Sequence, residues 1–121
     1  MVHNRTTFKI RRMDGGVSVV DVNGEITGLT ENEIVQAFSK AVRPGVNIIA
    51  WNFNKLDYMN SSGIGLLLTL LIRARKQGVR MCAYGLAAHY VQVFELSRLN
   101  EVMQLFETEE EVLESMVLAQ A

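Results

Sequence analysis

The chain has 121 residues, of which 49% are hydrophobic and 21% are charged, and its formal net charge is −1. These values predict one globular domain that folds without metals or disulfides, and they exclude the basic surface of a protein that binds nucleic acid directly. The longest apolar run, residues 64–72, is about half as long as a membrane-spanning helix. The amino-terminal stretch also lacks the apolar run of a signal peptide, so we expect a cytoplasmic protein without membrane insertion.

The first part of the chain reads as a hairpin followed by a helix. Residues 8–12 and 17–22 have strand character and flank Asp14-Gly15-Gly16, which favours a tight antiparallel turn. Asn23-Gly24 is expected to end the second strand. Thr30-Glu31-Asn32-Glu33 has the capping-box pattern that opens a helix, and apolar residues at helical spacing then predict an amphipathic helix that ends near Arg43.

The middle of the chain predicts a strand, a loop and a leucine-rich helix. Residues 47–53 read as the third strand and residues 54–59 as a loop, which leads to Asn60-Ser61-Ser62, a cluster of good helix-capping residues. A helix is expected over residues 64–76, with Gly78 as its stop. Its leucines leave little polar face, so we expect it to be the most buried helix.

The last part repeats the alternation of strand and helix. Residues 79–84 predict the fourth strand, residues 87–96 a short helix, and residues 101–106 a last short strand. Thr108 to Glu111 form a second capping-box pattern before the final helix. The expected fold is a single α/β domain over residues 1–121, with a mixed four- to five-stranded sheet, an N-terminal antiparallel hairpin and about four helices.

This topology predicts where a site would lie. In open α/β sheets, binding sites form where the chain leaves the carboxyl ends of parallel strands. Those exits are residues 24–27, 54–62 and 85–89. We therefore expect the three segments to converge on one edge of the domain.

The glycine-rich turn around residues 62–65 does not support catalysis. A dinucleotide fingerprint would need glycine where Leu68 stands, and no Gly-Lys-Ser/Thr sequence completes a phosphate-binding loop. A nucleophile elbow would need glycine in place of Met59. The single cysteine, Cys82, is expected to be a small core residue, and the two histidines have no partners at ligand spacing. We expect no enzyme activity, no cofactor and no metal.

Asn60-Ser61-Ser62-Gly63 leaves two interpretations open. Asn and Ser cap helices because their side chains accept hydrogen bonds from the free amides, so the segment can be purely structural. It can also be a phosphorylation site, since a helix N-terminus accommodates the charge of about −1.5 to −2 on a phosphoserine. The same charge inside a docking interface would repel a partner.

Three segments in register resemble the STAS family, which includes bacterial anti-sigma factor antagonists. Residues 56–66 (LDYMNSSGIGL) look like the family's hallmark, residues 22–26 (VNGEI) resemble its second-strand exit, and residues 94–111 resemble its carboxyl-terminal region. The resemblance covers nearly the whole chain.

The resemblance implies a regulatory mechanism. In the family, the unphosphorylated domain binds an anti-sigma factor with serine kinase activity, phosphorylation of the motif serine ends the interaction, and a serine phosphatase restores it. That serine corresponds to Ser61. The expected partner-binding residues follow from the motif and the adjacent strand exit: Glu25, Thr27, Asn60, Ser61, Ser62 and Gly63.

The chain departs from the family pattern at three positions. The family usually has aspartate where Asn60 stands, commonly at Asn52 and often at Thr27. Asn60 keeps its capping ability, and the loss of negative charge should make a phosphate on Ser61 easier to accommodate. The neutral residues Asn52 and Asn60 also motivate an alternative, a constitutive STAS scaffold or transporter-associated binding module. A third alternative is a sensor of small ligands or nucleotides, or an enzyme.

Overall fold

The structure of the protein, a computed structural model, describes residues 5–120. These residues form one five-stranded sheet whose spatial order follows the chain. The strands are β1 (Thr7–Met13), β2 (Val17–Ile26), β3 (Ile48–Met59), β4 (Arg80–Tyr84) and β5 (Gln104–Phe106). β1 and β2 pair antiparallel, and every later neighbour pairs parallel.

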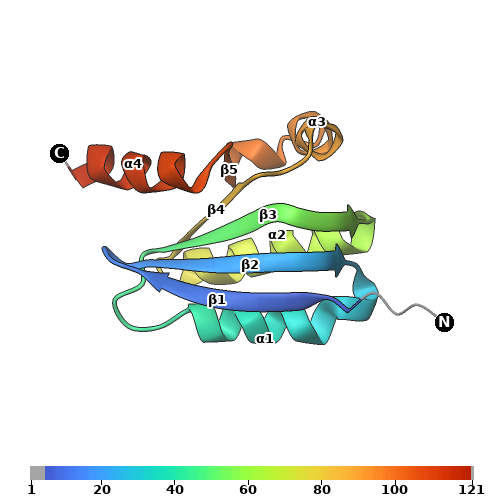
Figure 1. Ribbon diagram of the computed structural model, residues 1–121, viewed down its shortest axis with the longest axis horizontal. Helices are drawn as coiled ribbons and strands as arrows, with labels where there is room; N and C mark the ends of the chain where they lie inside the picture. Colours follow the sequence, from blue (N-terminus) through green and yellow to red (C-terminus); the bar gives the residue numbers. More distant parts are fainter. Residues whose placement is uncertain (1–4, 121) are drawn as a thin grey trace.

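Four α-helices and two short 3₁₀ turns connect the strands within the described residues (Figure 1). The helices are α1 (Glu31–Ala41), α2 (Ser61–Lys76), α3 (Ala88–Leu96) and α4 (Glu109–Gln120), and the 3₁₀ turns are η1 (Gly28–Thr30) and η2 (Leu99–Glu101). The predicted α/β fold, with a mixed sheet and an N-terminal hairpin, is confirmed.

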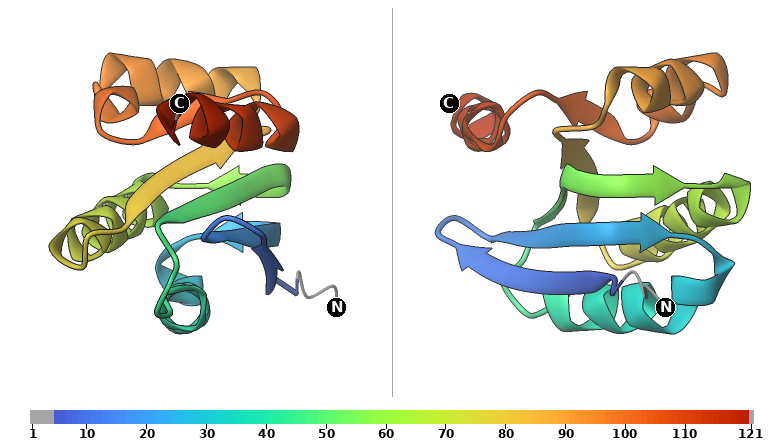
Figure 2. Two further views of the ribbon diagram at one scale, coloured as in Figure 1. Left: turned by 90° about the vertical axis from the view of Figure 1, so that its left-hand side faces the viewer. Right: turned by 45° about the vertical axis from the view of Figure 1, so that its right-hand side comes forward.

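Two apolar cores hold the helices against opposite faces of the sheet. The larger core includes buried residues from α1, α2 and α3, and the smaller one lies between the sheet and α4, through Val112 and Met116. Figure 2 shows the twist of the sheet between α1 on one side and α4 on the other. No helix within residues 5–120 is both long and apolar enough to cross a membrane.

Two strands run further than the sequence predicted. β2 continues through Asn23-Gly24 to Ile26, and the expected loop 54–59 is the second half of β3, because Glu25 pairs with Tyr58 and Ile26 with Met59. Register shifts on either side of Gly24 absorb the irregularity. Gly24 allows the backbone at Thr6 to pass close to β2. Its φ is +120°, and a Cβ at this position would lie 2.9 Å from the Cα of Thr6.

The first capping box lies three residues earlier than predicted. Thr30 makes no side-chain cap for α1. Thr27 and Thr30 instead close a reciprocal box around η1, with the Leu29 amide donating to Thr27 Oγ1 (3.1 Å) and the Thr27 amide donating to Thr30 Oγ1 (3.0 Å). This box fixes the turn that follows β2. The second predicted box is half formed, since the Glu111 amide donates to Thr108 Oγ1 (3.2 Å) while the Glu111 carboxylate accepts from the Glu107 amide (2.9 Å).

Helix α2 is amphipathic, although its leucines predicted a mostly buried helix. Leu67, Leu70 and Leu71 are buried against the sheet, whereas Leu68 is 42% and Ile72 49% exposed. The difference arises because α2 packs on the sheet through one side only, against β3 and β4 with α1 as its neighbour. The helix therefore presents an apolar outer face to solvent.

Candidate partner-binding edge

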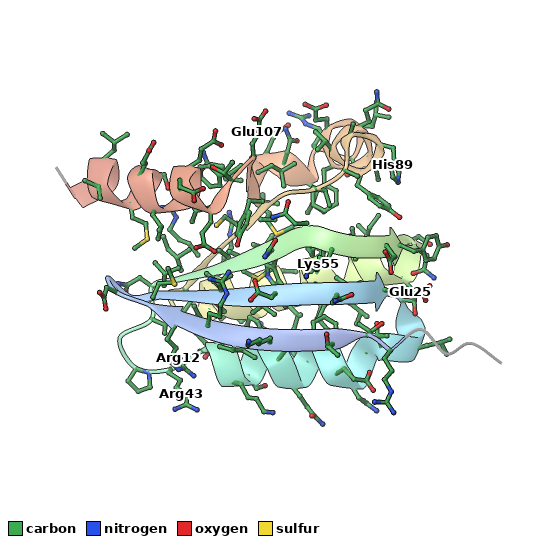
Figure 3. The ribbon with its side chains drawn as sticks, in the orientation of Figure 1. Arg12, Glu25, Arg43, Lys55, His89 and Glu107 are labelled. Atoms are coloured by element: carbon green, nitrogen blue, oxygen red, sulfur yellow. The ribbon has the colours of Figure 1, made fainter. Side chains whose placement is uncertain are left out.

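The ends of β2 and β3 and the start of α3 meet at one edge of the domain. The Asn60 amide donates to the Ile26 carbonyl (3.4 Å), and the Met59 amide donates to the hydroxyl of Tyr90 on α3 (2.8 Å). Figure 3 shows Glu25 and His89 at this end of the molecule. The convergence predicted from topology is therefore present, and β3 delivers the chain directly into α2.

Asn60 caps α2 as predicted, although the helix begins at Ser61 rather than at residue 64. The Asn60 backbone is extended (φ −101°, ψ −178°) and its Oδ1 accepts from the Gly63 amide at 2.9 Å. The Ile64 amide donates to the Asn60 carbonyl (3.0 Å). Because the first amides of a helix have no intrahelical acceptor, those of Ser61 and Ser62 remain for solvent or an anion.

Gly63 lets α2 start directly against β2. A Cβ at this position would lie 2.1 Å from the Ile26 carbonyl oxygen, closer than any real contact. A larger residue would push the helix away from the strand exit. Gly63 therefore sets the position of the exposed serines relative to the turn after β2.

Two large apolar side chains are exposed on the segments that lead into this edge. Leu29, in the doubly capped turn η1, is 94% exposed, and Tyr58, near the end of β3, is 48% exposed. Both serines are exposed, and Ser62 lies beneath η1, where a Cβ on Gly28 would be 3.9 Å from that of Ser62. Leu29 therefore presents a large apolar side chain from the turn that lies next to Ser62.

The six predicted site residues lie together but differ in exposure. Ser61 and Ser62 are exposed, and Asn60 and Glu25 are half-buried. Thr27 and Gly63 are buried, so they shape the edge rather than present side chains on it. Sequence reasoning missed Leu29, whose signal is a large apolar residue inside an otherwise polar turn.

Asn52 lies elsewhere, in a polar network on the α4 side of the sheet. Its Nδ2 donates to Asp21 Oδ1 at 2.7 Å, Asp21 pairs with Arg11 at 2.6 Å, and Arg11 also pairs with Glu109 on α4 at 2.6 Å. An aspartate at position 52 would face the Asp21 carboxylate, so the neutral residue fits this network. The expectation that Asn52 bears on the serine motif is corrected accordingly.

This network shifts the pKa values of its members. The hydrogen bond from Arg11 holds the pKa of Asp21 below its usual range, and the same guanidinium, together with the Tyr84 hydroxyl, lowers that of Glu109. Burial, then the bond to Glu109, raises the pKa of Tyr84. Both carboxylates are therefore ionised at neutral pH, and Glu109 holds α4 to β1 through Arg11 and to β4 through Tyr84. No cluster of His, Cys, Asp and Glu among the described residues could hold a metal ion.

The family model for the STAS domain matches residues 10–112, which include all five strands except the first residues of β1. The chain belongs to the STAS domain family. Residues 56–66, which resemble the hallmark segment of this family, form the end of β3 and the start of α2.

Solved structures share the STAS fold along nearly their whole length. The cell fate determinant SpoIIAA from Bacillus, in its phosphorylated form, is 27% identical with a TM-score of 0.69, and the match covers 90% of this chain and 98% of that one. An anti-sigma factor antagonist from Mycobacterium paratuberculosis is 24% identical (TM-score 0.74, covering 93% and 94%). A sulfate transporter family protein from Wolinella succinogenes is 12% identical (TM-score 0.75, covering 89% and 90%).

Proposed function

We propose that this STAS domain regulates transcription by partner switching: it binds an anti-sigma factor with serine kinase activity through the edge around Ser61, and phosphorylation of Ser61 releases it. The observation that carries this proposal is the exposed Ser61 hydroxyl at the first position of α2, at the edge where η1 presents the exposed Leu29. Similarity to anti-sigma factor antagonists, one of them in a phosphorylated form, supports it.

The local structure suits a switch that leaves the fold intact. A phosphate on Ser61 would face solvent, the open amides of Ser61 and Ser62 and the positive end of the helix dipole, so the domain itself tolerates the charge. Inside a docked interface the same charge of about −2 would be desolvated and repelled. A penalty of about 3–5 kcal/mol there weakens binding by roughly two to four orders of magnitude.

The first test is phosphorylation by the anti-sigma serine kinase of the same genome. With ATP, wild-type protein should gain one phosphate by intact mass, Ser61→Ala none, and the matched control Ser62→Ala one. Treatment with a serine phosphatase should return the wild-type mass to its starting value. Phosphate that persists on Ser61→Ala would remove Ser61 from this role.

The second test separates switching from constitutive binding. Ser61→Asp should lower the affinity for the kinase at least 100-fold in calorimetry, because it places a charge in the interface. The matched control Ser61→Asn introduces a neutral side chain of nearly the same size as aspartate, and it should lose far less affinity. A complex that ignores Ser61→Asp would favour the alternative of a constitutive STAS scaffold or transporter-associated module. The shared fold of the sulfate transporter family protein motivates that alternative.

A further inference from the structure

The outer face of α2 carries a continuous line of residues that begins at Ser61. We call Ser61, Gly65, Leu68 and Ile72 the α2 seam. Their separations of four, three and four residues place them on one side of a helix, in the spacing by which helices pack along each other. All four are exposed, while the residues that α2 buries lie on its opposite side.

Gly65 has no explanation within the domain. A glycine inside a helix destabilises it relative to alanine, and Gly63 is required because it touches the Ile26 carbonyl. At Gly65, in contrast, a Cβ would meet nothing within 4 Å, and the backbone is ordinary helix. Its effect is to leave a notch between Ser61 and Leu68 through which another backbone can approach closely.

The charged residues of α2 itself are all of one sign. α2 contains no acidic residue, and Arg73, Arg75 and Lys76 occupy its last turn. All three are exposed, and within residues 5–120 none of them forms an ion pair. A second copy of α2 would bring no acid to meet them, so the charge favours a partner with acidic side chains.

We propose that the α2 seam receives an acidic amphipathic helix of the kinase partner. The apolar face of that helix would pack on Leu68 and Ile72, its backbone would cross at Gly65, and its acidic residues would lie beside Arg73 and Lys76. This inference rests on the proposed function and adds the mode of recognition. It also places Ser61 at the first position of the seam, where a docked helix would desolvate a phosphate on this residue.

Gly65→Ala tests the proposal because it should move folding and binding in opposite directions. The added methyl group favours the helix, so the melting temperature should rise by about 3 °C. It also fills the notch, so affinity for the anti-sigma serine kinase should fall at least tenfold. Leu68→Ala and Ile72→Ala should each weaken binding about tenfold, whereas Leu96→Ala, at an 86% exposed leucine on α3, should leave it unchanged.

The outcomes distinguish this inference from the function on which it rests. If Gly65→Ala binds the kinase as tightly as wild type, the seam is not the docking site. The proposed function would still stand if Ser61→Asp released the kinase. Failure of wild-type protein to bind the kinase would overturn both. If Arg73→Gln combined with Lys76→Gln left the affinity and its salt dependence unaltered, the acidic helix would be the wrong partner. A dimer in sedimentation that Gly65→Ala dissolves would assign the seam to a second copy instead.

Discussion

Asn60 caps α2 with one side-chain oxygen, and its side chain is a neutral amide rather than a carboxylate. Its Oδ1 caps the Gly63 amide at 2.9 Å, a task that the aspartate usual in the family would perform equally well. An asparagine does so without placing a full negative charge one residue before Ser61. The cap is therefore retained, and the surroundings of a phosphate on Ser61 are less negative.

Two substitutions at Asn60 separate these roles. Asn60→Ala should lower the free energy of unfolding by about 1 kcal/mol, because the Gly63 amide loses its acceptor. Asn60→Asp should leave it within about 0.5 kcal/mol of wild type, since the cap persists and the acid complements the helix dipole. Urea denaturation of the three proteins measures both values, and an equal loss in both variants would contradict the capping role.

At this scale, sequence reasoning found what local chemistry encodes. The cap at Asn60 and the position of Ser61 depend on four consecutive residues and on amides next to them in the chain. Thr27 was missed as a cap because Thr30 offers the same pattern three residues later, and only the η1 turn decides between them. Leu29 was missed because its exposure depends on how that turn sits on the sheet.

Helix α4 is joined to the sheet by charge as well as by apolar contacts. Arg11 on β1 binds Asp21 on β2 and Glu109 at the start of α4, and the Tyr84 hydroxyl on β4 donates to the same Glu109 oxygen at 2.7 Å. The pKa values of both carboxyls are lowered. Such carboxyls contribute stability above their unfolded pKa, which is about 4, and lose it as the pH falls through their folded values.

Arg11→Met should expose this contribution. At pH 7 the variant should be less stable by about 1–3 kcal/mol, because two carboxylates lose a charged donor. The difference from wild type should begin to shrink as the pH falls below about 4, the unfolded pKa, and should disappear once both carboxyls are protonated in the folded protein as well. Urea titrations at several values between pH 3 and pH 7 measure this, and a difference that does not vary with pH would contradict the assigned network.

Strands and helices were predicted well where the spacing of apolar residues within the segment sets their ends. They were predicted poorly where pairing with another strand or packing on the sheet sets them. The alternation of apolar residues identified β1, β4 and α1 nearly to their ends. The predicted third strand was too short because polar residues interrupt the apolar pattern over residues 54–59, and only their pairing with β2 makes them a strand. The outer face of α2 was misjudged because leucine content does not say which side meets the sheet.

For the molecule as a whole, the fold class could be predicted and the long-range polar contacts could not. A hairpin followed by alternating helices and strands leaves few topologies. The partners in the network of Arg11 are up to 98 residues apart in the chain, so no local pattern links them. From the sequence, the neutral residue Asn52 was grouped with the changes around the serine motif. In the structure its amide donates a hydrogen bond to Asp21 on the neighbouring strand β2.

The thiol of Cys82 should report on the integrity of the whole domain. The side chain lies in the core beneath α4 at 6% exposure, and burial raises its pKa to about 12. Thiolate is the reactive form, so native protein should react with a disulfide reagent about a thousand-fold more slowly than the unfolded chain at pH 8. Labelling across a urea gradient should follow the unfolding transition, and rapid labelling in water would contradict this burial.

The order of the strands has a consequence for how the domain is made. Each new strand pairs with the one that precedes it in the chain, so the spatial order β1-β2-β3-β4-β5 is also the order of synthesis. No strand has to be inserted between two that are already paired. The sheet can therefore grow outward at a single edge while the chain emerges from the ribosome, and β1, β2 and β3 can pair with one another before β4 is made.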